Sequence, residues 1–335
     1  KFEQSGLDGL AAMPSARPLE HAPGITLVRP LLGFSKARLV DTLNAAGIAW
    51  IEDPSNENPR FERARVRALQ PALRDLGLVS GPLALSAQRL SRARRALDDY
   101  AERAFAATVG LNGGLFAFID RRALGTEPEE VRLRVMTRVI GLFGGLAPPP
   151  RLSEVEALMA RLERARTYGA TLGGTMITAG TSAIRVMREW GRSPPEAMTL
   201  EPGETALWDG RFAVSFLGTG LGSETAIGSS FGRAVTVRAL GHDARARLAA
   251  LGTGRQKSKA AGPAPSAGQA SKRGFGAPAL SYATLPSFWS GDNLIAVPTL
   301  AEAESGLQGP VIAGHAVCTA RFLDCEARLA PLRND

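Results

Sequence analysis

Cysteine, histidine and long apolar runs are all scarce in this 335-residue chain. Two cysteines, Cys318 and Cys325, and three scattered histidines cannot build a disulfide framework or a His/Cys zinc site. No apolar stretch approaches the roughly 20 residues that a membrane-spanning helix needs, and the start of the chain lacks the pattern of a signal peptide. These absences favour a soluble, cytoplasmic protein, and they predict neither a membrane partner nor a metal-ligand cluster.

The net charge of the chain indicates which class of molecule it binds. Lys and Arg total 40 against 32 Asp and Glu, so the formal net charge is +8 at pH 7. Such an excess favours a polyanionic partner such as RNA. The alternative is ordinary basic solubility, or the arginine-rich habit of a GC-rich genome. With 44% hydrophobic and 21% charged residues, the chain is long enough for two or three globular domains.

Residues 50–67 hold the most informative pattern of the chain. A polar turn comes first and three arginines follow at spacings of three and four: Asp53, Ser55 and Asn56, then Arg60, Arg63 and Arg67. The spacing places the arginines on one helical face, while Val66, Leu69 and Leu73 take another face that would pack inward. An acidic turn beside an arginine face suits a site for both a cation and a phosphate. The alternative is an Asx turn that caps a surface helix with solvated arginines.

Three motifs carry a resemblance to a known family. Asp53, Ser55 and Asn56, followed by Arg63 and Arg67, resemble the Asp-x-Ser-Asn and Arg-Asn-x-x-Arg pattern of the tRNA(Ile)-lysidine synthases, which are PP-loop ATP pyrophosphatases. Upstream, Arg-Pro-Leu-Leu at 29–32 is similar to a segment of that family, and residues 5–13 resemble its Arg-Gly-Ser-Gly-x-x-Gly-Leu loop. The order and spacing of the motifs agree over residues 1–80. Two departures are Ala64, where the family has asparagine, and Glu3-Gln4, where it has Arg-Gly.

Two further motifs of that family are missing from the chain. They are the Ser-Gly-Gly-x-Asp-Ser loop, which binds the phosphates of ATP, and a His-x-x-Asp-Asp motif. Residues 5–9 imitate the first loop but lack its second glycine and its final serine. We therefore expect an N-terminally truncated product that is inactive by itself, because a phosphate loop needs a strand before it and a helix N-terminus after it.

The resemblance implies that the complete enzyme is an ATP-dependent ligase of tRNA modification. Such an enzyme joins L-lysine to a cytidine in the anticodon loop of tRNA(Ile), forming lysidine, with ATP and Mg²⁺ as cofactors. The implied roles are catalysis for Asp53 and Asn56, ATP binding for Ser5, Gly6, Arg63 and Arg67, and contact with substrate or tRNA for Ser55, Arg60, Arg89 and Arg92. A homodimer is among the expectations.

Two alternatives belong to other classes. The chain could be a non-catalytic tRNA-binding remnant, and an in-frame Ser-Gly-Gly-x-Asp-Ser segment upstream would decide against that. It could also be an ATP pyrophosphatase that acts on another RNA base or a small amide. The Asp-x-Ser-Asn and Arg-x-x-x-Arg pair disfavours this last reading.

The order of the elements predicts a mixed α and β fold. Residues 1–80 are expected to be the C-terminal part of an adenine-nucleotide-hydrolase-like α/β domain, a remnant of the ATP pyrophosphatase domain. Residues 81–170 are expected to form a helical domain, and residues 171–335 a β-rich domain. The Gly, Ser, Ala, Pro and Lys composition of residues 253–278 predicts a disordered loop.

Local signals place individual elements. Ser35 and Gly47 bracket one helix, and 49–51 is strand-like. A long helix is expected at 83–109, and four arginines crowd its start, where they either contact tRNA backbone or form a solvated face: Arg89, Arg92, Arg94 and Arg95. Further helices are expected at 127–143 and 152–165, and strands at 115–119, 176–177, 184–186, 212–214 and 294–298.

Overall fold

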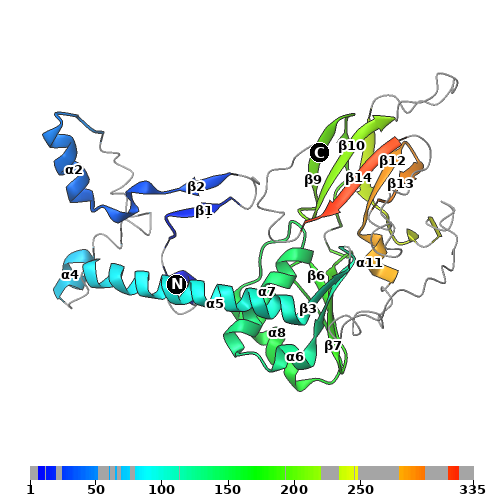
Figure 1. Ribbon diagram of the computed structural model, residues 1–335, viewed down its shortest axis with the longest axis horizontal. Helices are drawn as coiled ribbons and strands as arrows, with labels where there is room; N and C mark the ends of the chain where they lie inside the picture. The colour runs from blue at the N-terminus through cyan, green and yellow to red at the C-terminus, as the bar shows by residue number, and fades with distance from the viewer. Residues whose placement is uncertain are drawn as a thin grey trace, which may run out of the picture. The chain divides into compact units, whose positions relative to one another are not determined.

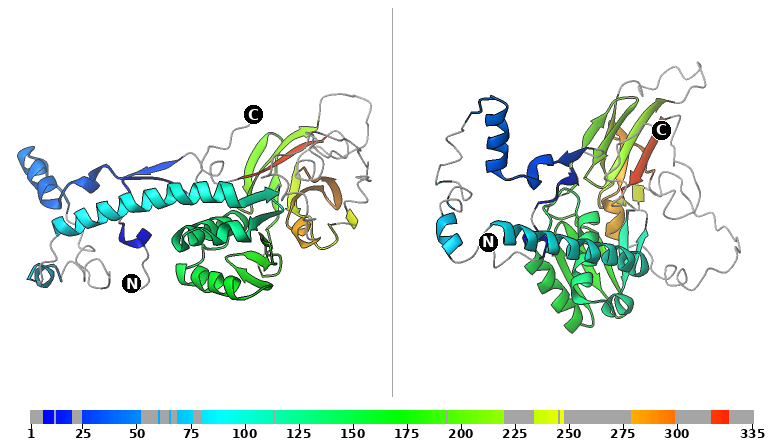
Figure 2. Two further views of the ribbon diagram at one scale, coloured as in Figure 1. Left: turned by 60° about the horizontal axis from the view of Figure 1, so that its bottom comes forward. Right: turned by 60° about the vertical axis from the view of Figure 1, so that its left-hand side comes forward.

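The chain forms two compact units, residues 1–97 and residues 98–335 (Figure 1, Figure 2). The computed structural model describes residues 7–11, 13–19, 25–51, 60, 65, 69–75, 80–112, 114–192, 194–219, 234–244, 246–247, 279–298 and 316–323. No helix in this part of the chain is long and apolar enough to cross a membrane. The predicted disordered loop at 253–278 lies outside it, so that expectation stays a prediction.

The described part of the first unit contains helices and a two-stranded ribbon. β1 (Ala16–Pro18) pairs antiparallel with β2 (Thr26–Val28). The other elements are α1 (Leu7–Leu10), the 3-10 turn η2 (Pro30–Gly33), α2 (Lys36–Ala45), α4 (Gln70–Asp75) and the first part of α5 (Ser80–Thr108). The predicted helix after Ser35 is confirmed, since the Ser35 hydroxyl accepts a hydrogen bond from the Arg38 amide at 3.2 Å. Gly47, just past its end, takes a left-handed φ of 66°.

The strand expected at residues 49–51 is wrong. The segment has no regular secondary structure, and Trp50 is 41% and Ile51 95% exposed. A strand needs a hydrogen-bonded neighbour, and no described strand pairs with these residues. The inward packing expected of Leu69 is wrong too, because that side chain is 57% exposed.

The second unit begins with an antiparallel five-stranded sheet covered by helices. Its strand order is β3 (Val109–Asn112), β4 (Phe116–Asp120), β7 (Ala183–Arg188), β6 (Thr175–Ala179) and β5 (Tyr168–Leu172). Between β4 and β5 run α6 (Arg121–Gly125), α7 (Glu129–Phe143) and α8 (Leu152–Arg164). α7 packs on β4 and β7, and α8 packs on β5. The helices expected at 127–143 and 152–165 are confirmed. The five strands of the sheet come from both sides of residue 170.

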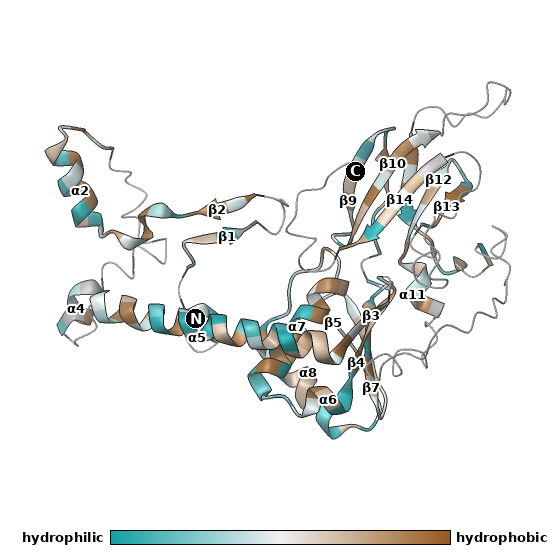
Figure 3. Ribbon diagram, in the orientation of Figure 1, coloured by the Kyte–Doolittle hydropathy of each residue, from teal (hydrophilic) through white to brown (hydrophobic). Residues whose placement is uncertain are grey.

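The described part of the second unit contains two further sheets, whereas the expected domain bounds, 81–170 and 171–335, stay predictions. A three-stranded sheet has the order β14 (Ala316–Phe322), β10 (Phe212–Thr219), β9 (Glu204–Trp208). A four-stranded sheet has the order β13 (Asn293–Ala296), β12 (Pro286–Ser290), β11 (Val235–Ala239), β8 (Met198–Leu200), with α11 (Ala279–Ala283) before β12. One apolar core joins the sheets and includes Phe116, Phe212 and Phe288. Hydrophobic residues recur along these strands and along α7 and α8 (Figure 3).

Candidate functional site

Most of the residues that the motifs single out lie outside the described residues: Ser5, Gly6, Asp53, Ser55, Asn56, Arg63 and Arg67. Their expected roles in catalysis and ATP binding therefore stay predictions. The other three candidates, Arg60, Arg89 and Arg92, are described and exposed. The structure places Arg89 and Arg92 together on α5.

The Arg-Pro-Leu-Leu motif has a local structural basis. The Arg29 guanidinium donates from Nη1 to the Pro14 carbonyl at 3.2 Å, and its backbone amide donates to the Ser15 carbonyl at 2.6 Å. Pro30 opens the η2 turn, where a fixed φ and a missing N–H cost nothing. Arg29 therefore ties the β1–β2 ribbon to the turn that leads into α2.

An exposed arginine surface lies on the first half of α5. Arg89, Arg92 and Arg95 are all exposed and recur every three residues, about 4.5 Å apart along the helix axis. Leu90 and Leu97 are half-buried on the other side. Three guanidinium groups within two turns make a positive surface that suits phosphate oxygens, since arginine presents a planar fork of donors.

A second basic centre lies on the four-stranded sheet, and it pairs two arginines with one tryptophan. The Cζ atoms of Arg238 and Arg247 are 3.9 Å and 5.3 Å from the centroid of the Trp289 ring. The Trp289 indole donates to the Ser287 hydroxyl at 2.8 Å, and that hydroxyl donates to the Arg238 carbonyl at 2.6 Å. Both guanidinium groups are therefore held against an aromatic face, a favourable cation–π arrangement.

The stack was not among the sites expected from the sequence, although the strand pattern carries a signal for it. Residues 235–239 alternate apolar and polar, which puts Thr236 and Arg238 on one face of β11. Thr236 stands opposite Trp289 in the antiparallel register, so Arg238 is a diagonal neighbour of that ring. The sequence shows the alternation of residues 235–239, but it does not show which residues of β11 and β12 lie opposite one another.

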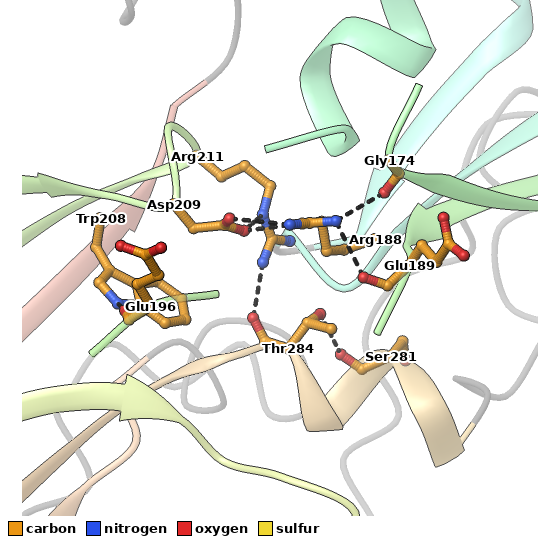
Figure 4. Close-up of polar contacts among 9 residues, drawn as sticks. All are labelled: Gly174, Arg188, Glu189, Glu196, Trp208, Asp209, Arg211, Ser281 and Thr284. Atoms are coloured by element: carbon orange, nitrogen blue, oxygen red, sulfur yellow. Dashed lines mark hydrogen bonds and ion pairs between the residues drawn. The ribbon is translucent and has the colours of Figure 1, made fainter. Parts of the chain in front are cut away.

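A buried ionic cluster joins the sheets of the second unit (Figure 4). Asp209 accepts hydrogen bonds from Arg188 Nε at 3.1 Å and from Arg211 Nε at 2.7 Å. The side chains of Arg188, Asp209 and Arg211 are only 4%, 3% and 0% exposed. Arg211 also donates to the Thr284 carbonyl at 2.7 Å, and Arg188 to the Gly174 carbonyl at 3.0 Å. The cluster is sealed from solvent, so its role is to hold the fold together.

Two other ionisable groups of the described part, Cys318 and Tyr100, have raised pKa values. Burial raises the pKa of the Cys318 thiol to about 12, so the thiol stays neutral and inert. The Glu127 carboxylate hydrogen-bonds the Tyr100 hydroxyl and raises its pKa. Within the described residues, no group of His, Cys, Asp and Glu side chains is placed to hold a metal ion. A hollow of about 60 Å³ between α7 and α8, lined in part by Arg132 and Glu163, admits a few waters and is too small for a nucleotide.

Comparison with known proteins finds a matching domain family and several similar proteins. Residues 2–73 match the PP-loop domain family. The tRNA(Ile)-lysidine synthase of Ruegeria pomeroyi is 38% identical over 210 residues, which cover 63% of this chain and 48% of that protein. The synthase of a Bradyrhizobium species is 39% identical over 202 residues, which cover 54% of this chain and 55% of that protein. The synthase of Methylobacterium nodulans is 39% identical over 190 residues, which cover 54% of this chain and 56% of that protein. The chain spans about half the length of the curated relatives it matches.

Proposed function

We propose that this chain shares the function of the tRNA(Ile)-lysidine synthases that it resembles. In this proposal it supplies the tRNA-holding part and one side of the active site of an enzyme that attaches lysine to a tRNA cytidine. One observation carries the proposal. The 38% identity to the Ruegeria pomeroyi synthase extends over 210 residues, so it reaches well beyond the PP-loop match at residues 2–73. The likeness therefore includes the helices and sheets that follow, and not only a nucleotide-binding module.

In the proposed reaction, the C2 carbonyl oxygen of the cytidine would attack the α-phosphate of ATP and release pyrophosphate. The lysine amine would then displace AMP and lose a proton. We assign Asp53 to orient the lysine ammonium group, because a carboxylate is the natural partner of a cation. Ser55 and Asn56 would hold the turn or a substrate hydroxyl. Ser5 and Gly6 would border the nucleotide. Arg63 and Arg67 would bind phosphate oxygens of ATP.

Mg²⁺ would neutralise phosphate charge in this reaction. The described residues bring together no set of donors for it, so we assign no protein ligand to the ion. The side chains of Asp53, Ser55 and Asn56 carry a carboxylate, a hydroxyl and an amide oxygen, which are hard oxygen donors of the kind that Mg²⁺ prefers.

For tRNA binding we assign phosphate contacts to the arginine surface of α5. Arg89 and Arg92 are exposed on the same side of the helix, and the net charge of +8 favours an RNA partner over the whole chain. Arg60 and Ser55 are proposed as further contacts. Phosphate contacts set affinity through the release of condensed counterions, so the binding has a measurable dependence on salt.

The test is tRNA affinity as a function of salt. We expect log K to fall linearly with log[salt], and the double variant Arg89→Gln/Arg92→Gln to reduce the slope by about 0.7–0.9 for each lost contact. A matched control, Arg164→Gln/Arg192→Gln, removes the same charge from exposed positions of the second unit and should leave the slope nearly unchanged. An equal loss in both pairs would show that net charge alone governs binding and would contradict the assignment to α5.

The second candidate function is tRNA binding without catalysis. The exposed arginine surface of α5 favours it, because phosphate contacts can bind tRNA without the backbone amides that adenylation needs to hold the pyrophosphate. This candidate predicts the same salt dependence but no lysine transfer when the rest of a PP-loop domain is supplied.

A further inference from the structure

Helix α5 is one unbroken helix of 29 residues, yet very little of it is buried. It runs from the first unit into the second, because the boundary between residues 97 and 98 falls within it. No residue between 81 and 103 is buried, whereas Ala104 and Thr108 near its end are. The half of the helix that carries the arginine surface therefore has no buried side chain to fix it.

Two arginines of α7 hold α5 by its acidic side chains. Arg134 Nη1 lies 2.6 Å from the Asp98 carboxylate, and Arg138 forms an ion pair with Glu102. The Arg138 Cζ atom also lies 4.2 Å from the centroid of the Phe105 ring, which is a cation–π contact. These five side chains, three from α5 and two from α7, are called the α5–α7 clamp.

The two ion pairs of the clamp follow one register. Each joins residues 36 positions apart, 98 with 134 and 102 with 138, so a spacing of four on α5 meets a spacing of four on α7. Residues four apart share one side of a helix, and one stripe of α5 therefore faces one stripe of α7. Glu130 holds Arg134 from its own helix at 2.8 Å. This repetition over successive turns indicates a built contact between the helices.

The arginines are the better shielded partners of these pairs. The side chains of Arg134 and Arg138 are 15% and 22% exposed, whereas those of Asp98 and Glu102 are 51% and 57% exposed. An ion pair that is shielded on one side is screened less by salt than a fully exposed pair. The clamp therefore stabilises the contact at physiological salt, while its acidic side chains stay open to substitution.

The clamp shortens the lever on which the arginine surface of α5 sits. Without it, the nearest buried anchor is Ala104, about 18 Å from Arg92 along the helix axis, whereas Asp98 is about 9 Å from Arg92. The same tilt of the helix would move Arg92 about twice as far with the clamp open. Restraining a mobile surface on binding costs free energy, which lowers affinity.

We propose that Arg134 and Arg138 are positioning residues, which hold the arginine surface of α5 in place for the phosphates of an RNA. They act through Asp98 and Glu102, and contact with RNA is not part of their role. This role rests on the proposed tRNA contact of α5, and it adds the residues that prepare that contact before RNA arrives.

The first measurement needs no RNA. Nitroxide labels at Ala93→Cys and Gly141→Cys, both at exposed positions, report the separation of α5 and α7 by pulsed electron paramagnetic resonance. Cys325→Ser removes a competing thiol, and the remaining native cysteine is buried. The clamp variant, Asp98→Asn/Glu102→Gln, should widen the distance distribution about twofold. An unchanged distribution would overturn the proposal, whatever the chain binds.

The second measurement is tRNA affinity, for which charge and position predict opposite results. The clamp variant removes two negative charges, so general attraction to RNA would tighten binding. We expect binding to be about three- to tenfold weaker. The matched control is Asp99→Asn, which removes a charge at the next exposed position, about 100° further around the helix. This control should not weaken binding, and equal or tighter binding by the clamp variant would overturn the proposal.

A charge exchange tests the ion pair itself. Arg138→Glu places two carboxylates together, and it should widen the distance distribution and weaken tRNA binding. Adding Glu102→Arg restores both an ion pair and the net charge, and it should recover most of the lost affinity. No recovery would overturn the proposal. If Arg138→Glu does not fold, as judged by circular dichroism, the clamp variant decides, because both of its altered side chains are more than half exposed.

Failure of this role and failure of the proposed tRNA contact give different results. If Arg89→Gln/Arg92→Gln weakens tRNA binding and the clamp variant does not, the positioning role is wrong and the tRNA contact stands. If neither variant weakens binding, the tRNA contact of α5 is wrong, and the positioning role falls with it.

Discussion

Asp209→Asn should strongly destabilise the second unit. Asp209 lies between Arg188 and Arg211, and the three side chains are almost completely buried. Removing the carboxylate charge leaves two buried guanidinium groups without the anion between them. Breaking a buried ion pair in this way costs about 3–5 kcal/mol.

Replacing Asp209 with asparagine removes the negative charge and keeps the shape of the side chain nearly the same. Asp209 has a left-handed φ of 49° in the hairpin turn before Gly210, and asparagine tolerates that conformation about as well as aspartate does. The backbone cost is therefore small. For a unit of this size, 1 kcal/mol shifts the melting temperature by about 2–4 °C, so a fall of about 6–20 °C is expected.

The assay is urea denaturation followed by tryptophan fluorescence, with thermal unfolding by circular dichroism alongside. Trp208 reports locally, because its indole donates to the Glu196 carbonyl at 2.8 Å beside the cluster. The matched control is Asp292→Asn, which lies in the turn of the β12–β13 hairpin and is exposed; it should change stability by less than about 0.5 kcal/mol. A change equally small for Asp209→Asn would refute the account of the cluster.

Three further predictions concern glycine packing, thiol ionisation and the segment outside the described residues. Gly174→Ala should cost about 2–5 kcal/mol in urea titration, because Gly174 has a φ of 73° and a Cβ would lie 2.3 Å from the Gly144 carbonyl oxygen; Gly203→Ala, with a φ of 84° and open space around it, should cost only about 1–2 kcal/mol. Burial raises the pKa of Cys318 to about 12, so iodoacetamide at pH 8 should label it only after unfolding, as read by peptide mass mapping. Stability should also fall as the pH rises above about 8.5, where the unfolded thiol ionises first; labelling of the native thiol would contradict both statements. Deleting residues 253–278 should leave the melting temperature nearly unchanged, since their composition cannot offset the entropy of ordering, and a large drop would show that they pack.

Local signals in the sequence predicted the elements well. The Ser35 cap, the periodic apolar residues of α7 and α8 and the alternation in β10 each depend on neighbours within a few positions, and such patterns are visible in one sequence. The strand expected at 49–51 failed because strand formation depends on a partner that the local sequence does not specify.

Tertiary pairings were the part that the sequence did not reveal. Asp209 meets Arg188 from 21 positions away, and Arg211 reaches the Thr284 carbonyl from 73 positions away. Both contacts follow from how the sheets are joined, and not from any spacing motif. Of the candidate site, sequence reasoning found the exposed Arg89 and Arg92, whereas the Trp289 stack required the register of β11 and β12.

The most direct test of the proposed function is transfer of labelled lysine to tRNA(Ile) in the presence of ATP and Mg²⁺. The chain completed with the segment of the Ruegeria pomeroyi synthase that lies outside the matched stretch should incorporate lysine, and Asp53→Asn in this chain should abolish the transfer without weakening tRNA binding. The chain alone should incorporate none above a no-enzyme control, because it has no loop to hold the pyrophosphate of ATP. Failure of the completed pair to transfer lysine, while it still forms a complex and binds tRNA, would contradict the account.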